Sequence, residues 1–193
     1  EILRLGNNEL TGSIPDEIGD MDNLNILKLN SNQLSGTIPE NIGSLTKLDT
    51  LRLDNNNLEG TIPSNITNMA ELEYLYLQGN NLSGYIPENI GNLTNLIQLY
   101  LDNNNLEGEI PQSIGSLTNL LRLYLYKNNF SGQIPESICN IYDSNIDFWM
   151  YLSNNRLCPI SEDLYLDCSS VLDSAVPYLS TQIGPQSPQA ECD

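Results

Sequence analysis

The sequence predicts an α/β repeat fold, a right-handed solenoid with short parallel strands on its concave face and irregular or 3-10 turns on its convex face. Two observations support this prediction. Leucines recur every 24 residues in the spacing L-x-x-L-x-L, and Asn, Gly and an Ile-Pro pair stand at fixed places in the copies. One unit of this size cannot bury its own apolar face, so successive copies must stack and share a continuous core.

The leucine segment that opens each copy predicts a short strand, because leucines alternate there with variable residues. Neighbouring strands should pair in parallel, about 4.8 Å apart. The amide of an asparagine both donates and accepts hydrogen bonds, so an asparagine just after the strand is expected to satisfy backbone groups where the chain bends. Six copies have this residue: Asn8, Asn32, Asn56, Asn80, Asn104 and Asn128.

Each copy then turns through an L-x-G-x-I-P segment. The glycine suits a position that needs permissive dihedral angles, and the proline after isoleucine is expected to fix the convex turn. This unit resembles the plant-specific class of leucine-rich repeats, and six copies carry it between residues 1 and 143. The resemblance implies an extracellular protein similar to receptor ectodomains and secreted members of that class.

The pattern divides the chain into three regions. Residues 1–143 hold six 24-residue repeats, the first without its leading residue and without the N-terminal cap usual in this family. Residues 144–168 are predicted to form a divergent seventh repeat, with Asp147 and Met150 at leucine positions, and a cysteine-containing C-terminal cap. Residues 169–193 are predicted to form an extended tail rich in Ser, Pro and Gln. The uncapped first coil indicates a piece of a longer solenoid, or a face that another subunit covers.

Four cysteines lie at the C-terminal end of the chain. Similarity to the Cys-paired caps of extracellular family members implies the disulfides Cys158–Cys168 and Cys139–Cys192. Cys139–Cys168 is the competing pair, because Cys139 takes the Gly position of the sixth copy and Cys168 should lie near the equivalent place one coil on. Free thiols are the remaining alternative and would suit a reducing compartment.

Composition argues against several functions. The chain contains seven Lys and Arg residues but 25 Asp and Glu residues. The resulting net charge of −18 disfavours nucleic acid and anionic membranes as partners. The chain has no histidine, the commonest general base and metal ligand. No motif resembles a nucleophile elbow, a phosphate loop or a metal cluster, so the sequence predicts no enzyme, no cofactor and no metal. No apolar run is long enough to span a bilayer.

Four sequons predict N-glycosylation, although the repeat itself generates N-L-S and N-L-T by chance. Together with the cysteines and the family's usual location, they favour a secreted or cell-surface glycoprotein. The acceptor residues are Asn65, Asn81, Asn92 and Asn129.

Function is expected at the variable strand positions, which point to the concave face and can change without disturbing the core. Cations gather there in the first copies and aromatic residues in the later ones, which favours binding, although tyrosines about 4.8 Å apart could also form a purely stabilising ladder. Asp54 and Asp102 are expected to face solvent. The predicted binding residues are Arg4, Lys28, Arg52, Tyr74, Tyr76, Tyr100, Arg122, Tyr124, Tyr126, Trp149 and Tyr151.

These features predict an extracellular recognition module that binds a peptide, protein or glycan on its concave face. A structural subunit of a filament or matrix is the alternative, in which identical subunits assemble head to tail through the open first coil. The family resemblance also admits a secreted inhibitor of wall-degrading enzymes. Ice binding would require a regular row of Thr, and no column is so uniform.

Overall fold

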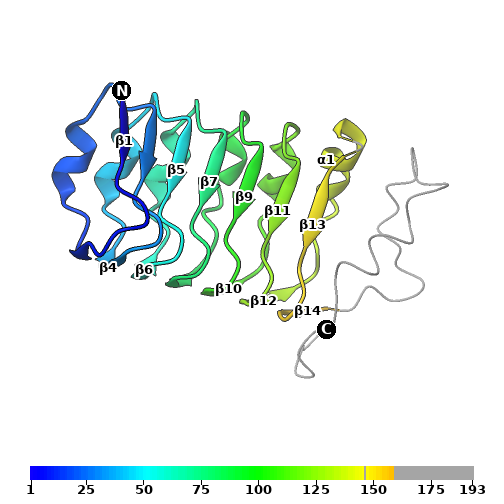
Figure 1. Cartoon of the computed structure of the whole chain (residues 1–193). Helices are drawn as coiled ribbons and strands as arrows, with labels where there is room; N and C mark the ends of the chain where they lie inside the picture. The colour runs from blue at the N-terminus through cyan, green and yellow to red at the C-terminus, as the bar shows by residue number, and fades with distance from the viewer. Residues whose placement is uncertain (146, 159–193) are drawn as a thin grey trace.

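The computed structural model describes residues 1–145 and 147–158, which stack as successive coils (Figure 1). One side of the stack is a seven-stranded parallel sheet in chain order, in which Leu27 pairs with Leu51, one repeat further on. This arrangement confirms the predicted solenoid of short parallel strands. The strands of this first sheet are β1 (Ile2–Arg4), β3 (Ile26–Lys28), β5 (Thr50–Arg52), β7 (Tyr74–Tyr76), β9 (Gln98–Tyr100), β11 (Arg122–Tyr124) and β13 (Trp149–Tyr151).

A second seven-stranded parallel sheet, which the sequence interpretation missed, follows the first strand of each coil. Its register differs from that of the first sheet, because Gly36 pairs with Leu58, 58 − 36 = 22 residues on. Neighbouring coils are therefore offset by two residues on this side relative to the first sheet. The strands are β2 (Thr11–Gly12), β4 (Gln33–Thr37), β6 (Asn57–Thr61), β8 (Asn81–Gly84), β10 (Asn105–Gly108), β12 (Asn129–Gly132) and β14 (Arg156–Leu157).

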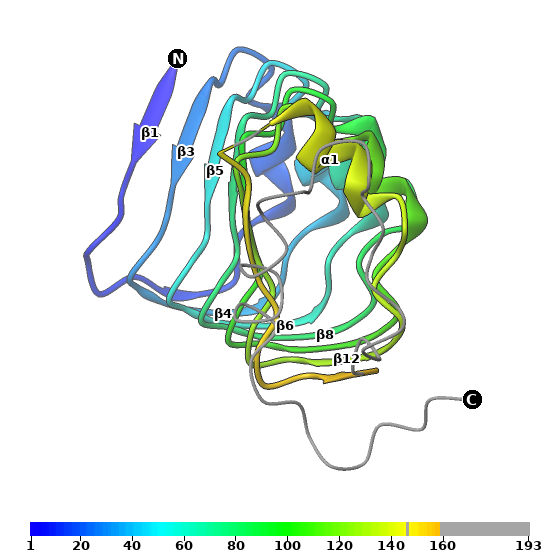
Figure 2. The ribbon, with the colours of Figure 1, turned by 90° about the vertical axis from the view of Figure 1, so that its right-hand side faces the viewer.

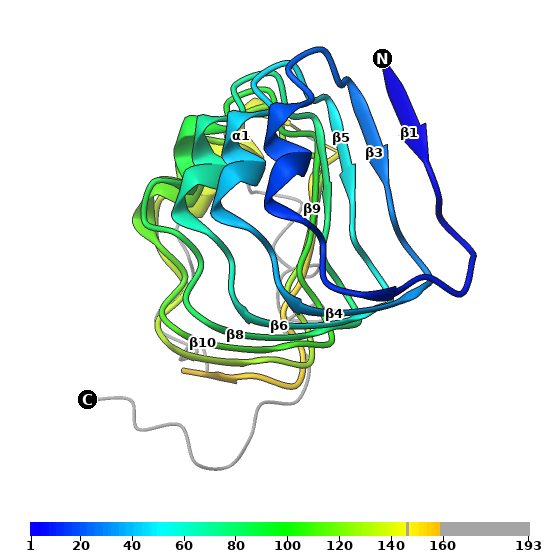
Figure 3. The same cartoon turned by 90° about the vertical axis from the view of Figure 1, so that its left-hand side faces the viewer.

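The third side consists of short helices. Each of four 3-10 helices follows a proline in extended conformation, as at Pro39, so the Ile-Pro pair ends the second strand and starts the turn. The end views show the resulting three-sided cross-section (Figures 2 and 3). The helices are η1 (Asp16–Asp20), η2 (Glu40–Ser44), η3 (Ser64–Asn68), η4 (Ile90–Asn92), η5 (Gln112–Ser116) and α1 (Ile138–Ser144).

The three sides enclose one continuous core of leucine and isoleucine, in which Leu51, Leu53 and Leu58 are fully buried. The repeated asparagines border this core as predicted. Asn80 Nδ2 donates to the carbonyls of Leu53 and Leu77, each at 3.0 Å, and Asn80 Oδ1 accepts from the Leu58 amide at 3.1 Å. Because one amide serves two coils, the asparagine fixes both the bend and the stacking.

The seventh coil departs from the sequence prediction at one leucine position. Met150 and Leu152 are buried as expected, but Asp147 is exposed and Phe148 is buried instead. The Phe148 amide donates to the Asn145 carbonyl at 3.1 Å, matching the Leu120 to Leu117 bond of the coil before. Phe148 therefore takes the first apolar position, because it follows the end of α1 by the same interval that separates Leu120 from the end of η5, and an apolar ring fits the core better than a carboxylate.

Cys139 and Cys158 are both disulfide-bonded. Cys168 and Cys192 lie outside the described residues, so the predicted pairing stays a prediction, as do the rest of the C-terminal cap and the tail over 169–193. Within residues 1–145 and 147–158, no helix has the length and hydropathy to cross a bilayer.

Candidate interaction face

The outward face of the first sheet, which we call the strand face, carries ten of the eleven predicted binding residues, and Tyr126 lies just after β11. In six of its strands the middle residue is buried and its neighbours are partly or fully exposed, as in β7 with Leu75 between Tyr74 and Tyr76. The strand face is formed by Ile2, Arg4, Ile26, Lys28, Thr50, Arg52, Tyr74, Tyr76, Gln98, Tyr100, Arg122, Tyr124, Trp149 and Tyr151.

Tyrosines form a continuous row across the last four strands of this face. The Tyr76 and Tyr100 rings meet edge to face with centroids 4.9 Å apart, and Tyr100 and Tyr124 stack in parallel at 4.3 Å. Tyr124 then meets Tyr151 edge to face at 4.7 Å. Such pairs stabilise one another beyond the area they bury, so the row is rigid. A rigid aromatic surface loses little entropy when a ligand binds it.

Two hydroxyls in this row, those of Tyr76 and Tyr100, act as neutral groups. Burial raises the pKa of Tyr100 to about 12, and the neighbouring Tyr124 and Tyr76 rings add to the shift. Burial also raises the pKa of Tyr76, although the Arg52 charge opposes it. The Tyr76 hydroxyl donates to Gln98 Oε1 at 2.7 Å. At physiological pH these side chains can donate hydrogen bonds and stack, but they are not ionised as nucleophiles or bases.

Arg52 is held within its own coil. Its Nε and Nη2 donate to the two carboxylate oxygens of Asp54, each at 2.9 Å, and its guanidinium lies 5.0 Å from the Tyr76 ring centroid. This bidentate pair raises the pKa of Arg52. Arg52 therefore contributes a neutralised, planar surface to the strand face rather than a free charge.

The other predicted cations differ in how far they are engaged. Arg122 Nη1 donates to the Leu121 and Asp147 carbonyls at 2.7 Å, with its guanidinium 5.8 Å from the Trp149 ring. Among the described residues, Arg4 and Lys28 have no carboxylate within ion-pair distance. Arg4, Lys28 and Arg122 therefore keep positive charges on this face that no carboxylate of the described residues neutralises, and the first two are also free of the backbone bonds that hold Arg122.

Asp54 and Asp102 do not face solvent, contrary to the sequence prediction. They are 1% and 3% exposed, because the chain bends inward at the end of the strand and alternation no longer holds there. Asp54 is paired with Arg52, whereas Asp102 Oδ2 accepts a bond of 2.6 Å from Asn103 Nδ2 and Asp102 Oδ1 has no hydrogen-bond partner. Burial raises the pKa of Asp102, and its hydrogen bonds oppose this shift only in part.

The four predicted glycosylation sites all lie off the strand face. Asn81 and Asn129 belong to β8 and β12 of the second sheet, Asn65 lies in η3 and Asn92 ends η4. All but the half-buried Asn129 are exposed. Glycans on these residues would leave the strand face uncovered.

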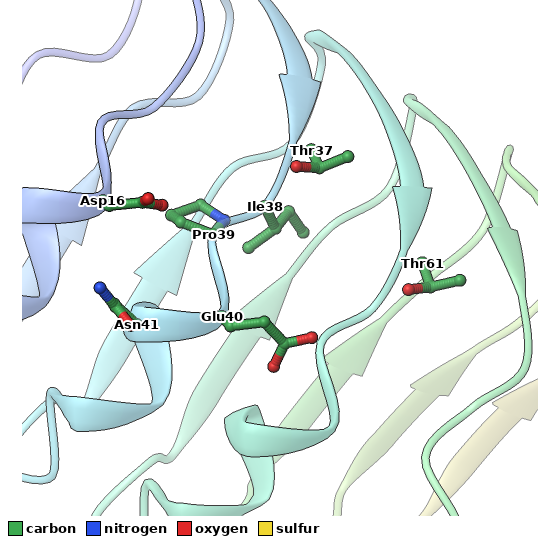
Figure 4. A pocket seen from close by; sticks show the side chains of 7 residues that line it. All are labelled: Asp16, Thr37, Ile38, Pro39, Glu40, Asn41 and Thr61. Carbon is green, nitrogen blue, oxygen red and sulfur yellow. The ribbon is translucent and has the colours of Figure 1, made fainter.

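A pocket of about 380 Å³ opens between the second sheet and the helical side in the early coils (Figure 4). Asp16 lies beside Pro39, while Glu40 points away toward the next coil, so the two carboxylates do not converge. No group of His, Cys, Asp or Glu within the described ranges could hold a metal ion. The lining residues are Asp16, Thr37, Ile38, Pro39, Glu40, Asn41 and Thr61.

The repeat lattice and the sequence together define the family. The chain matches the family models Leucine rich repeat over residues 46–106 and Leucine Rich Repeat over residues 1–21, 23–45 and 119–141. It belongs to the leucine-rich-repeat family and resembles the ectodomains of plant receptor kinases. No curated protein sequence matches it.

Three solved structures show the resemblance. The ectodomain of the receptor kinase GASSHO1/SCHENGEN3 from Arabidopsis thaliana, in complex with CASPARIAN STRIP INTEGRITY FACTOR 2, is 38% identical, with a TM-score of 0.77 over 81% of this chain and 18% of that chain. The Arabidopsis receptor kinase HAESA, in complex with the peptide hormone IDA and the co-receptor SERK1, is 37% identical, with a TM-score of 0.73 over 79% of this chain and 26% of that chain. Pollen Receptor Kinase 3 is 30% identical, with a TM-score of 0.74 over 85% of this chain and 78% of that chain. This chain thus spans about a fifth to a quarter of the first two.

Proposed function

We propose that the chain is a non-catalytic, extracellular recognition module that holds an extended peptide or protein segment along the strand face. The observation that carries the proposal is the stacked tyrosine row, which continues from Tyr76 through Tyr100 and Tyr124 to Tyr151 on an open surface. Tyrosine offers a large contact area and a hydroxyl at a low entropic cost, as in protein-interface hot spots.

The charge on this face also suits recognition. Arg4 and Lys28 place free positive charge beside the aromatic row in a chain whose net charge is −18. An acidic group on a partner would be attracted to these strands and repelled by most of the remaining surface. The relatives support the ligand class, since HAESA was crystallised with a peptide hormone and a co-receptor.

An extracellular location is part of the proposal. It is supported by similarity to receptor ectodomains, by four sequons outside the strand face, and by two cysteines in disulfide bonds. Mass spectrometry of the natural protein before and after enzymatic deglycosylation tests it. We expect a mass loss that maps to at least one of the four sequon asparagines, and an unchanged mass would contradict the proposal.

The binding proposal is tested by selecting peptides from a random display library on the immobilised chain. We expect selected peptides to lose binding when Tyr100→Ala and Tyr124→Ala are combined. Tyr85→Ala is the matched control, because Tyr85 is 64% exposed and follows β8 on the second sheet. If the double variant binds every peptide as well as the wild type and only melts at a lower temperature, the tyrosines form a stabilising ladder and no binding surface.

Two alternatives have tests of their own. Tyrosines also stack on sugar rings, so the same three proteins applied to a glycan array would show whether a glycan is the ligand. Head-to-tail assembly into a filament is tested by sedimentation of the natural protein. A purely monomeric result would exclude the filament.

A further inference from the structure

We propose that Asp102 forms a binding site on the strand side for an arginine guanidinium of the partner, together with Gln78 and Tyr126, which precede and follow it in the same column of the repeat. We call these three residues the Asp102 site. The inference rests on the proposed function, and its own test uses a small probe that needs no partner.

The first observation is a buried carboxylate with one oxygen that receives no hydrogen bond. Asp102 is 3% exposed, its Oδ1 has no hydrogen-bond donor, and no cation of the described residues lies within ion-pair distance. Gln78 Oε1, in the preceding coil, is also buried without a donor. Asp102 Oδ1 and Gln78 Oε1 are therefore two buried acceptors in neighbouring coils, and neither receives a hydrogen bond. A guanidinium supplies five N–H donors in one plane together with a positive charge.

The second observation is that the chain satisfies the equivalent carboxylate with an arginine of its own. Asp54 stands two repeats earlier in the same column and receives two bonds of 2.9 Å from Arg52, which packs over the Tyr76 ring. At Asp102 the position of Arg52 is taken by Tyr100, whose ring stacks on Tyr124 at 4.3 Å. Since the coil has no arginine there, Asp102 lacks the cation that Asp54 receives from its own coil.

The surroundings already attract a cation. Lys127 Nζ lies 5.9 Å from the Tyr126 ring centroid, yet it does not come within 4.0 Å of a carboxylate. Lys127 also has a backbone φ of 54°, a left-handed conformation that asparagine or glycine takes in most of the equivalent coils. Its ammonium competes weakly with any cation that approaches Asp102.

The two neighbours of Asp102 in its column lie between it and solvent. Gln78 and Tyr126 are both half-buried, so each reaches the surface. Burial and contact with Asp102 raise the pKa of Tyr126, which indicates that the Tyr126 hydroxyl lies close to the carboxylate. A guanidinium would displace these groups by rotation about side-chain bonds, while the buried leucines on either side keep the backbone in place.

The test is a titration of the intact chain at pH 7 with N-acetyl-arginine amide, followed by calorimetry and by NMR of the tyrosine rings. N-acetyl-citrulline amide, which has nearly the same shape but no charge, is the control probe. We expect saturable binding of the arginine probe only, weakened at least about tenfold by Asp102→Asn. Glu107→Gln is the matched variant, because it removes an exposed carboxylate from the same repeat on β10 of the second sheet, and it should leave binding unchanged.

A gain of affinity provides a second readout that structural damage would not produce. Lys127→Asn removes the competing ammonium and should tighten binding of the arginine probe about two- to fivefold. Equal affinities of wild type and Asp102→Asn, or of the arginine and citrulline probes, would overturn the inference, as would the lack of saturable binding. If library peptides still required Tyr100 and Tyr124 in that case, only the Asp102 site would be wrong and the proposed function would stand.

Discussion

Asn80 shows how much of the fold depends on one side chain. Its amide makes two donor bonds and one acceptor bond to backbone groups of two coils. We predict that Asn80→Ala lowers the free energy of unfolding by about 3 kcal/mol, because several buried backbone groups lose their partners. Asn57→Ala, at an exposed position of β6, should change it by less than about 0.5 kcal/mol. Urea unfolding followed by circular dichroism measures both, and similar losses would contradict this role.

Asp102 makes a second prediction, about pH. Burial raises the pKa of this carboxyl in the folded chain above its ordinary value of 3.8, so the folded state binds the proton more tightly than the unfolded state. Its contribution to stability is therefore greatest at low pH and is lost as pH rises through the raised pKa. We expect Asp102→Asn to unfold at a higher temperature than the wild type at pH 7, with the difference shrinking toward pH 4.

Asp54→Asn is the matched control for that pH series. Since Asp54 accepts both bonds from Arg52, its substitution removes an ion pair and should lower the melting temperature at pH 7. If both variants changed stability in the same direction, the environments of the two carboxylates would not differ as the structure indicates.

The two aspartates also show which residue environments could not be predicted from the sequence. The asparagine role followed from donor and acceptor chemistry at a fixed position, and the structure confirms it. The expectation that Asp54 and Asp102 face solvent was wrong, because it extended strand alternation past the strand. β5 ends at Arg52, and Leu53 and Asp54 are consecutive buried residues at the bend.

At the scale of elements, the 3-10 helices pack so closely from coil to coil that they leave little room for a side chain at one column. A Cβ on Gly43 of η2 would lie 2.2 Å from the Asn65 carbonyl oxygen of η3, so only glycine fits. Thr67 occupies the corresponding place in η3, and the helix that follows, η4, has three residues where the other four 3-10 helices have five. Side-chain bulk at this column thus coincides with a shorter helix in the next coil.

We predict that Gly43→Ala lowers the free energy of unfolding by about 2 kcal/mol, because the backbone of the next coil must move away. Asn41→Ala in the same helix keeps its Cβ and changes only an exposed side chain, so its effect should stay within about 0.5 kcal/mol. Thermal unfolding of the two variants decides this. If Gly43→Ala left the free energy of unfolding unchanged, neighbouring coils could move apart at this position without loss of stability.

The second sheet was not predicted, although its residues are visible in the repeat. Its strands contain Asn and Gly, which have low strand propensity, and most are only four or five residues long. They become strands because the asparagine row and the leucine core hold each coil at pairing distance from the next. The pairing is thus a consequence of stacking and not of local preference.

For the molecule as a whole, burial is uneven along the stack. Leu51, Leu75 and Leu99 in the central coils are at most 1% exposed, whereas Leu5 and Leu10 in the first coil are 40% and 38% exposed. In a repeat protein each coil is stabilised mainly by its neighbours. We predict that amides of the central strands exchange with deuterium about a hundredfold more slowly than those of the first coil in this chain. Uniform protection along the stack would instead indicate a single cooperative unit.

The amino-acid sequence alone predicts the repeat length, the stacked architecture, the inward leucines, the asparagine row and the list of outward strand residues. Each of these follows from periodicity, because a residue that recurs at one place in every coil has one environment. Four features appear only in the folded chain: the second sheet, the burial of Asp54 and Asp102, the replacement of Asp147 by Phe148 in the core, and the pairing of Arg52 with a carboxylate. The second sheet depends on how one coil contacts the next, through residues more than 20 positions apart, whereas the burial of the aspartates and the pairing of Arg52 depend on a bend in the backbone that strand alternation does not describe.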